Sequence, residues 1–336
     1  MAFVFLPPMQ TNLYHPFKKM RFDDAHCFLS GEKIEKGESL AIFSDWLSES
    51  YQLKDMPFKM LDESFLTYAD ITIPCATAVK EKFEHLENQI QDAFEKGFEG
   101  VKNLDEKLIF QWVAKMVYGV IFKEIQSAIK QQHTFAEGFN MSQGLIHKFS
   151  MLHIMLQSIN QNMVFEDFKP YSIFICKVNN AENEFAYRDE INTLTFSLRM
   201  KDFGLLVNLQ DNGANKRYHE EIWNKIAGKT LHPIQFEELC AKVFYSAYLF
   251  NRLPEYHIIP TEEAVFIEAM PLKGMNAKPI FDDWNFKIYG QVVENFWKRW
   301  GFLLLEIIKN PEQPMSFLTD EHKEFIPNAT IALPIT

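Results

Sequence analysis

The sequence predicts an α+β protein in which a loop-rich N-terminal region precedes a mainly helical body with a small antiparallel sheet. Apolar residues make up 47% of the 336 residues, a share sufficient for a real hydrophobic core. Stretches with helical spacing and stretches with strand spacing of apolar residues both occur. They are grouped by kind and do not alternate as βαβ units, which favours α+β. We place the boundary near Gly100, between regions 1–100 and 101–336.

Before Pro74 the chain is predicted to be irregular, with short strands. Residues 40–51 have the pattern of a strand end or turn that runs into a short helix, and residues 67–75 that of a short strand. After Pro74 the apolar residues recur every three or four positions, as on one stripe of an amphipathic helix. That stripe consists of Val79, Phe83, Leu86, Ile90 and Phe94. Gly97 and Gly100 are expected to end the helix.

Two more helices are predicted at the start of the body. Residues 107–129 are apolar on two adjacent sides, so this helix is expected to be buried. Asn103 followed by Glu106 is a candidate helix start. The two apolar sides consist of Leu108, Trp112, Met116 and Val120, and of Ile109, Val113, Val117 and Ile121. A further helix is predicted for residues 144–159.

Three strands are predicted to form the antiparallel sheet. Residues 171–178 have the composition of a buried strand. Residues 193–200 alternate between apolar and polar side chains, which is the period of a strand with one exposed face. Residues 204–213 follow after a short turn and end on a turn signal.

Helices return after this sheet. Residues 232–254 are predicted to form a helix with Pro233 in its first turn. Residues 264–270 are predicted to form another strand. A last long helix is predicted for residues 290–308, ending near Pro311.

Net charge and cysteine usage limit the classes of function. Asp and Glu number 45 against 34 Lys and Arg, so the chain carries −11 and lacks the positive field of a strong phosphate binder. Four widely spaced cysteines predict a reducing compartment and no disulfide framework. The N-terminus is a poor signal peptide, and no apolar run reaches the ~18 residues of a membrane span. We therefore expect a soluble, cytoplasmic protein without a membrane partner.

The stretch HCFLSGEK, residues 26–33, reads like the first half of a zinc knuckle, which has Cys-x-x-Cys before a glycine. Here Cys27 is followed by Ser30 in place of the second cysteine. The stretches IFSDWL, ITIPC and FEHLE then follow in order. Together they resemble the HNH endonuclease-like family, in which a ββα-metal finger is built on such knuckles. The likeness covers the first third of the chain best and extends loosely to residues 110–124 and 231–247.

The resemblance implies that most of the family's site is lost. Cys27 corresponds to the first metal cysteine and Cys75 to a cysteine after the Ile-Pro pair. Ser30 stands where the second metal cysteine is expected, and Val79 where the last one is expected. Ala41 stands where the family has its catalytic histidine. Structural zinc needs about four ligands, and hydrolysis in this fold needs a base and a metal. The resemblance therefore implies a degenerate finger without metal, cofactor or catalytic residue.

Two interpretations of these residues lead to different functions. Taken by themselves, Cys27 and Cys75 are most simply small buried side chains. Taken with the resemblance, they predict a catalytically inactive HNH-nuclease-like protein that binds a protein partner or, weakly, nucleic acid. Two alternatives stay open: an active metal-dependent DNA endonuclease with a rearranged site, and an unrelated small-molecule enzyme with a deep polar pocket away from Cys27.

Overall fold

We describe the fold from a computed structural model, and the structure describes residues 13–135, 141–273 and 277–335. The chain divides into two compact units, each assembled from three segments. The first unit comprises Met1–Glu87, Ala114–Pro170 and Leu253–Pro271. The second unit comprises Asn88–Val113, Tyr171–Arg252 and Leu272–Thr336. Gly100, where we placed the boundary between regions 1–100 and 101–336, lies inside the second unit.

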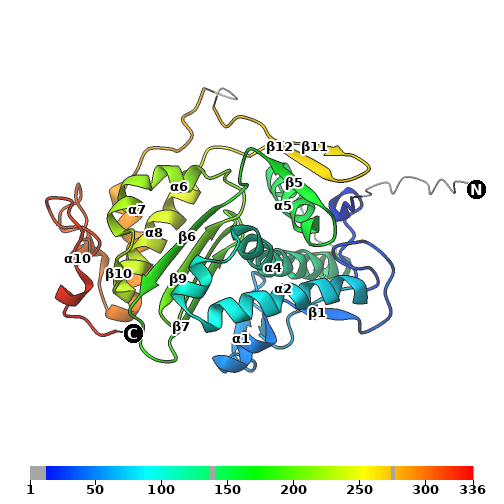
Figure 1. Ribbon diagram of the computed structural model, residues 1–336, viewed down its shortest axis with the longest axis horizontal. Coiled ribbons are helices and arrows are strands. Elements are labelled where there is room, and N and C mark those ends of the chain that lie inside the picture. Colours follow the sequence, from blue (N-terminus) through cyan, green and yellow to red (C-terminus); the bar gives the residue numbers. More distant parts are fainter. Residues whose placement is uncertain (1–12, 136–140, 274–276, 336) are drawn as a thin grey trace, which may run out of the picture. The chain divides into compact units, whose positions relative to one another are not determined.

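The first unit contains two short paired strands followed by the first part of a helix, whose end belongs to the second unit (Figure 1). β1 (Ser39–Ala41) pairs antiparallel with β4 (Thr72–Pro74). α2 (Thr77–Glu95) begins after two residues that follow β4. All five residues of the apolar stripe predicted for this helix are buried, so the helix prediction is confirmed.

A short helix and a hairpin connect β1 to β4. α1 (Asp45–Ser50) follows β1 as the sequence predicted. β2 (Pro57–Lys59) and β3 (Phe65–Thr67) pair antiparallel and form the hairpin. Because this hairpin has only two strands of three residues, its position depends on contacts with the rest of the unit.

The first unit also holds a three-stranded sheet with the strand order β11-β12-β5. β11 (Tyr256–Pro260) and β12 (Val265–Ala269) are antiparallel, and β5 (Met163–Glu166) runs parallel to β12. Only β12 was predicted. β5 and β11 have no distinct pattern of their own, and they form by pairing with β12.

Two long helices follow α2. α4 (Glu106–Phe135) begins after Asp105, whose carboxylate accepts a hydrogen bond from the Lys107 N–H at 2.9 Å. The start predicted at Asn103 is therefore wrong. Seven of the eight residues on the two predicted apolar sides are buried, which confirms that this helix lies in the core. α5 (Gln143–Leu156) agrees with the helix predicted next.

The second unit is built on a five-stranded sheet with the strand order β10-β6-β9-β8-β7. Its strands are β6 (Ser172–Val178), β7 (Phe185–Glu190), β8 (Thr195–Met200), β9 (Phe203–Asn208) and β10 (Thr230–Leu231). Neighbours are antiparallel except β10, which runs parallel to β6. Our prediction of a mainly helical body with a small antiparallel sheet is therefore wrong, because residues 101–336 hold this sheet and the three-stranded one.

The sequence pattern did not predict two features of this sheet. β7 reads FAYRDE, without alternation, and it forms because β8 supplies its hydrogen-bond partners. β8 was predicted to have one exposed face, yet all six of its residues are buried, Arg199 included. Cover on both faces of a sheet cannot be read from the alternation within one strand.

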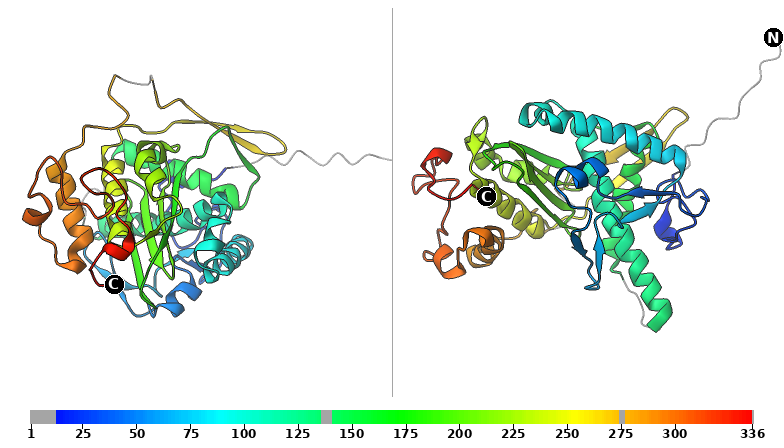
Figure 2. Two further views of the ribbon diagram at one scale, coloured as in Figure 1. Left: turned by 60° about the vertical axis from the view of Figure 1, so that its left-hand side comes forward. Right: turned by 90° about the horizontal axis from the view of Figure 1, so that it is seen from below.

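Helices and aromatic side chains cover the two faces of the sheet. α8 (Pro233–Leu249) packs on β6, β8 and β9, and α9 (Phe286–Trp297) packs on α8 (Figure 2). On the other face the rings of Phe94 and Phe203 meet edge to face at 4.9 Å. Pro233 occupies the first turn of α8 as predicted. The short helices of this unit are α3 (Phe98–Lys102), α6 (Ala214–Tyr218), α7 (Glu220–Ile226) and α10 (Leu304–Ile307).

The last helix differs from its prediction as one long helix over 290–308. α9 ends at Trp297, and a turn reaches Gly301, which has a φ of +79°. This left-handed conformation interrupts the helix before α10 begins. Across the described parts of the chain, every helix is too short or too polar to cross a bilayer.

Candidate functional site

The turn at Cys27 is closed by backbone hydrogen bonds. The Cys27 N–H donates to the carbonyl of Glu32 at 2.8 Å, and the Gly31 N–H donates to the carbonyl of Cys27 at 2.9 Å. Gly31 has a φ of +71°, and a Cβ added there would lie 2.3 Å from the Tyr14 ring. The position therefore requires glycine both for its backbone conformation and for the close approach of the ring.

This turn brings Cys27 beside Cys75, as the sequence reasoning expected. The Phe28 N–H donates to the Pro74 carbonyl at 2.8 Å, so the residues next to the two cysteines are joined. Both thiols are buried, and the Cys75 thiol donates to the Ala76 carbonyl at 3.6 Å. The structure thus holds two sulfur atoms together at the junction between the turn, the end of β4 and the start of α2.

Hydrogen-bond donors gather at the Cys27 sulfur. The Cys75 thiol lowers the pKa of Cys27 far below its usual range, although burial acts in the opposite direction. The N–H groups of Ala76 and Ser30 lower this pKa further. The pKa of Cys75 is raised, because it hydrogen-bonds to Cys27 and is buried. The first proton therefore leaves Cys27, and Cys75 retains its own.

Ser30 and Val79 do not complete a metal site with the two thiols. Ser30 is half-buried, and its hydroxyl donates to the Glu32 carboxylate at 3.1 Å. Val79 lies in the first turn of α2, is buried and has no ligating atom. Two thiols and one hydroxyl do not match the donor set of a structural zinc. Within the three described ranges, no group of three or more His, Cys, Asp or Glu side chains could hold a metal ion.

Ala41, where the sequence comparison predicted a lost catalytic histidine, has a buried cation beside it. Ala41 ends β1, and its carbonyl accepts a hydrogen bond from the Lys115 ammonium at 3.3 Å. Lys115 comes from α4, is 1% exposed and forms an ion pair with Glu87 of α2. The fold thus places a buried ammonium group beside the last residue of β1.

Glu87 is held in its charged form by three donors. Its carboxylate accepts hydrogen bonds from Lys115, from the Ser44 hydroxyl and from the Trp46 indole at 3.0 Å. Burial opposes the charge, but Lys115 and these hydrogen bonds outweigh it and lower the pKa of Glu87. Sequence reasoning missed this cluster. The sequence feature that could have indicated it was Lys115, a lone charged residue among the apolar residues of the helix that was predicted to be buried.

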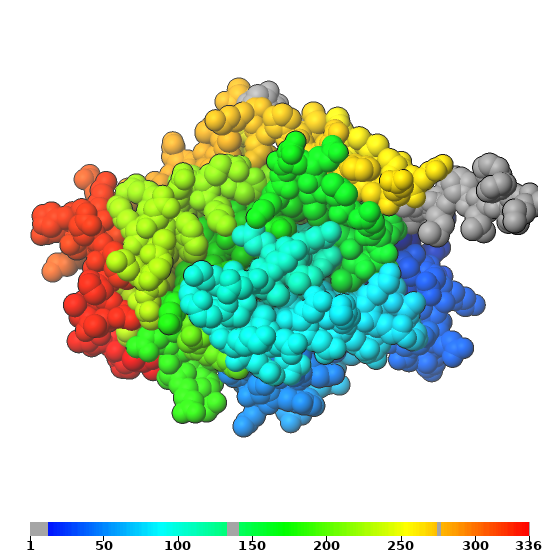
Figure 3. All heavy atoms as spheres, in the orientation of Figure 1, coloured from blue at the N-terminus to red at the C-terminus, as the bar shows by residue number. Residues whose placement is uncertain are grey.

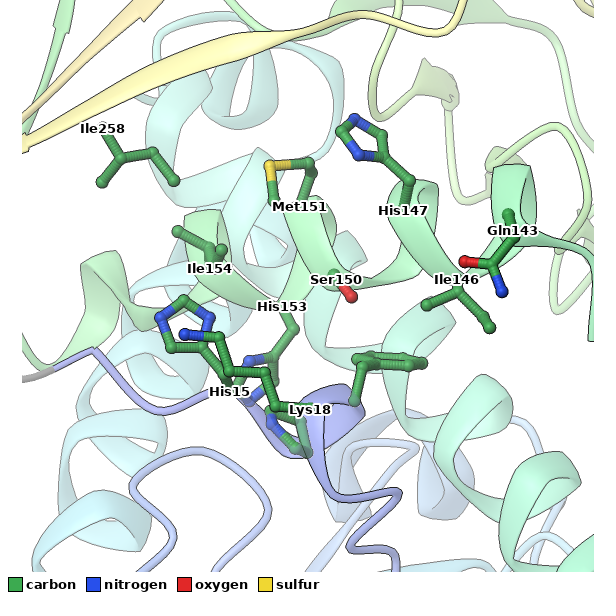
Figure 4. A pocket seen from close by; sticks show the side chains of 12 residues that line it. His15, Lys18, Gln143, Ile146, His147, Ser150, Met151, His153, Ile154 and Ile258 are labelled. Atoms are coloured by element: carbon green, nitrogen blue, oxygen red, sulfur yellow. The ribbon is translucent and has the colours of Figure 1, made fainter.

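A pocket of about 380 Å³ opens in the first unit between residues 16–18 and α5. In Figure 4 the side chains of His15 and Lys18 approach it from one side and Ser150 from α5. Its buried histidine, His153, donates from Nε2 to the Phe28 carbonyl at 2.8 Å. Burial lowers the pKa of His153 to about 4, so the ring is neutral near pH 7. His153 therefore supports the turn at Cys27 and is not placed as a charged ligand-binding group.

The second unit contains a buried polar network that sequence reasoning also missed. His219, which is buried, hydrogen-bonds through Nε2 to the Ser246 hydroxyl at 2.8 Å. Ser246 donates to Asn215, and the amide of Asn215 donates to Asp211, which also accepts from Ser172. Burial lowers the pKa of His219 to about 3. Because Ser246 is fully buried, this network joins α6 to α8 and does not present a nucleophile to solvent.

Comparisons of the chain with protein-family models, with curated proteins and with solved structures find no match. A functional assignment therefore has to come from the geometry of the residues themselves. The turn at Cys27, the cation beside Ala41 and the surfaces of the first unit are its basis.

Proposed function

We propose that this chain is a catalytically inactive, HNH-nuclease-like protein that acts by binding a protein partner. The observation that carries the proposal is the Lys115 ammonium, which hydrogen-bonds to the carbonyl of Ala41 and pairs with Glu87. In the resembled family this position supplies the histidine that activates water.

A buried ammonium at this point is unfavourable for metal-dependent hydrolysis. A divalent cation beside Ala41 would be repelled by Lys115, and this repulsion is poorly screened away from solvent. Ala41 has no group that accepts a proton from water. Glu87 is the nearby carboxylate, and its oxygens already accept from Lys115, Ser44 and Trp46. These contacts support a role of the β1, β4 and α2 elements as a scaffold.

The hairpin formed by β2 and β3 is the surface that best fits a protein partner. Leu61 is 70% exposed and Phe65 is 63% exposed at its tip. The tip is fastened to α4, because the Leu61 N–H donates to Glu124 at 2.9 Å and Asp62 accepts from Ser127 at 2.8 Å. Exposed apolar side chains on an anchored backbone are typical of binding surfaces, since less conformational entropy is lost on association.

Charge favours protein over nucleic acid as the partner. The chain carries −11, and the hairpin itself includes Asp62 and Glu63. The exposed side of α2, whose atoms are cyan in Figure 3, carries acidic and basic residues in turn, such as Lys80, Glu81 and Lys82. A phosphate-binding face would need basic residues without this acidic interleaving.

The loss of catalysis is tested with purified protein and plasmid DNA. We expect well under one zinc per chain by elemental analysis and no cleavage with added Mg²⁺ or Mn²⁺. Stoichiometric zinc, or cleavage that disappears in the variant Lys115→Met, would overturn this half of the proposal. It would support the alternative of an active endonuclease with a rearranged site.

Partner binding is tested with the double variant Leu61→Asp/Phe65→Asp. Proteins retained from a cell extract by the wild type should be lost with this variant. The matched control is Leu305→Asp, an 80% exposed leucine in the second unit, which should leave retention unchanged. Equal loss with both variants, or retention by both, would contradict a role for the hairpin.

A further inference from the structure

The pocket between residues 15–18 and α5 is built from the first unit alone (Figure 4). Its lining comes from these residues, from α5 and from Ile258 of β11. The volume is about 380 Å³, and pockets that hold small molecules measure roughly 300–1,000 Å³. The pocket is therefore large enough for a small organic ligand.

Apolar side chains form much of the pocket wall. Phe17 and Ile154 are buried, and Ile146, Met151 and Ile258 are half-buried. None of these five side chains donates a hydrogen bond, so their surface favours the apolar part of a ligand over water. A ligand that fits this wall has an apolar body.

Lys18 and His15 lie together at one end of the pocket, which we call the cationic end (Figure 4). Among the residues that the structure describes, neither side chain has a hydrogen-bond partner, and Lys18 forms no ion pair. Burial and the charge of Lys18 lower the pKa of His15, so its ring is neutral near pH 7 and keeps one N–H to donate. The cationic end thus offers an ammonium group and a ring N–H to a ligand.

The other two histidines of the pocket are engaged within the protein. His153 donates from Nε2 to the Phe28 carbonyl at 2.8 Å, and its Nδ1 accepts from the Gln157 amide at 3.3 Å. His147 hydrogen-bonds through Nε2 to the Pro254 carbonyl at 3.3 Å. These two rings therefore do not compete for the polar group of a ligand, which is directed to the cationic end.

Charge selects the class of that polar group. The chain carries −11, yet none of the described residues that line the pocket is Asp or Glu, and Lys18 adds one positive charge. A carboxylate carries one negative charge, whereas a phosphate monoester carries about −1.5 to −2 at pH 7 and is well matched by Arg. One Lys without an Arg in the lining favours a carboxylate.

We propose that this pocket binds a small carboxylate with an apolar body, whose carboxylate accepts a hydrogen bond from the Lys18 ammonium. The His15 ring donates to the second carboxylate oxygen, and the apolar body lies against Met151, Ile154 and Ile258. Burial of the body supplies most of the affinity, and the exposed Lys18 supplies the preference for a carboxylate. This inference does not depend on the proposed protein partner.

The test is an isothermal titration of the full-length protein with octanoate. Octanol has nearly the same body without the charge, and acetate has the charge without the body. We expect saturable binding of octanoate, binding of octanol that is about fivefold weaker, and no binding of acetate at the same concentrations. Octanol that binds as tightly as octanoate, or octanoate that does not bind at millimolar concentration, would overturn the proposal.

A matched pair of lysine variants locates the charge. Lys18→Met should weaken octanoate about fivefold and leave octanol unchanged, because the charge is lost and the chain length is kept. Lys19→Met is the control, since it removes the same charge from the next residue, which does not line the pocket. Both lysines are exposed, so neither variant endangers the fold. Equal weakening of octanoate by both variants would contradict a carboxylate site at Lys18.

The variant Ser150→Phe tests whether the body lies in the pocket. Ser150 lines the pocket from α5 and is half-buried, so a ring at this position should fill the space and abolish octanoate binding. Full octanoate binding by this variant would place the ligand elsewhere and overturn the proposal. If Ser150→Phe fails to fold, the two lysine variants decide.

Discussion

Glycine at position 31 shows how one residue shapes the turn at Cys27. Its backbone has a φ of +71°, and the Tyr14 ring occupies the space of a Cβ. We predict that Gly31→Ala destabilises the protein by about 2 kcal/mol or more, because strain in the left-handed region alone costs about 1–2 kcal/mol. Urea unfolding measures the change.

Gly37→Ala is the matched control for this prediction. Gly37 also has a positive φ, of +100°, but nothing lies within 4 Å of an added Cβ. The difference between the two variants therefore reports the contact with Tyr14. Equal destabilisation by both would show that the ring moves away without cost.

His153 makes stability depend on pH. Its pKa is about 4 in the folded chain against 6.5 as the ordinary value, because the ring is buried. The folded chain thus binds fewer protons between these values, and stability from this residue is present above about pH 6.5 and is lost as the pH falls toward 4. We predict a loss of up to about 3 kcal/mol over this range.

The His153→Gln variant isolates this contribution. Glutamine can still donate to the Phe28 carbonyl, but it does not titrate. Denaturant unfolding of both proteins between pH 7 and 4 should give a free-energy difference that shrinks as the pH falls. A difference that stays constant with pH would mean that the pKa of His153 does not change on folding.

At the scale of elements, a single ion pair joins α2 to α4 beside β1. Removing one partner leaves the other charge buried without compensation, which typically costs 3–5 kcal/mol. We predict that Lys115→Met destabilises the protein by about that amount, because the Glu87 carboxylate loses its charged partner, while Ser44 and Trp46 remain as neutral donors. The double variant Lys115→Met/Glu87→Gln should recover most of the loss. If it does not, packing around the two side chains contributes more to stability than their charges do.

The burial of α4 leads to a second prediction at the scale of elements. Trp112 is fully buried, and its ring meets Phe94 at 5.1 Å. Trp112→Ala should cost about 3–5 kcal/mol of unfolding free energy, because the cavity is surrounded by side chains that cannot all collapse into it. Gln132→Ala, an exposed position on the same helix, should change stability by less than about 0.5 kcal/mol in the same urea titration.

For the whole molecule, the net charge of −11 predicts a low affinity for nucleic acid. Non-specific DNA binding should be weak and vanish at ~150 mM salt, where the Debye length is about 8 Å. A gel-shift titration of duplex DNA at low and at physiological salt measures this. A complex that survives at ~150 mM salt would contradict the prediction and restore nucleic acid as a partner.

Much of the helical structure could be predicted without coordinates, because helical periodicity is a local property of the chain. The stripe from Val79 to Phe94 and the two apolar sides of α4 were sufficient to place both helices and to predict their burial. The approach of Cys27 to Cys75 was also expected, although from a family resemblance and not from spacing.

Pairing between segments that are distant in the sequence decided the features that could not be predicted. β7, β10 and β11 have no distinct pattern, and they become strands because a neighbouring strand offers its hydrogen-bonding edge. The predicted helical body was wrong for this reason. Lys115 is buried because Glu87 and the Ala41 carbonyl meet it from other elements. A charged side chain can be buried only when its partners are buried beside it. Whether those partners meet it is decided by the tertiary structure.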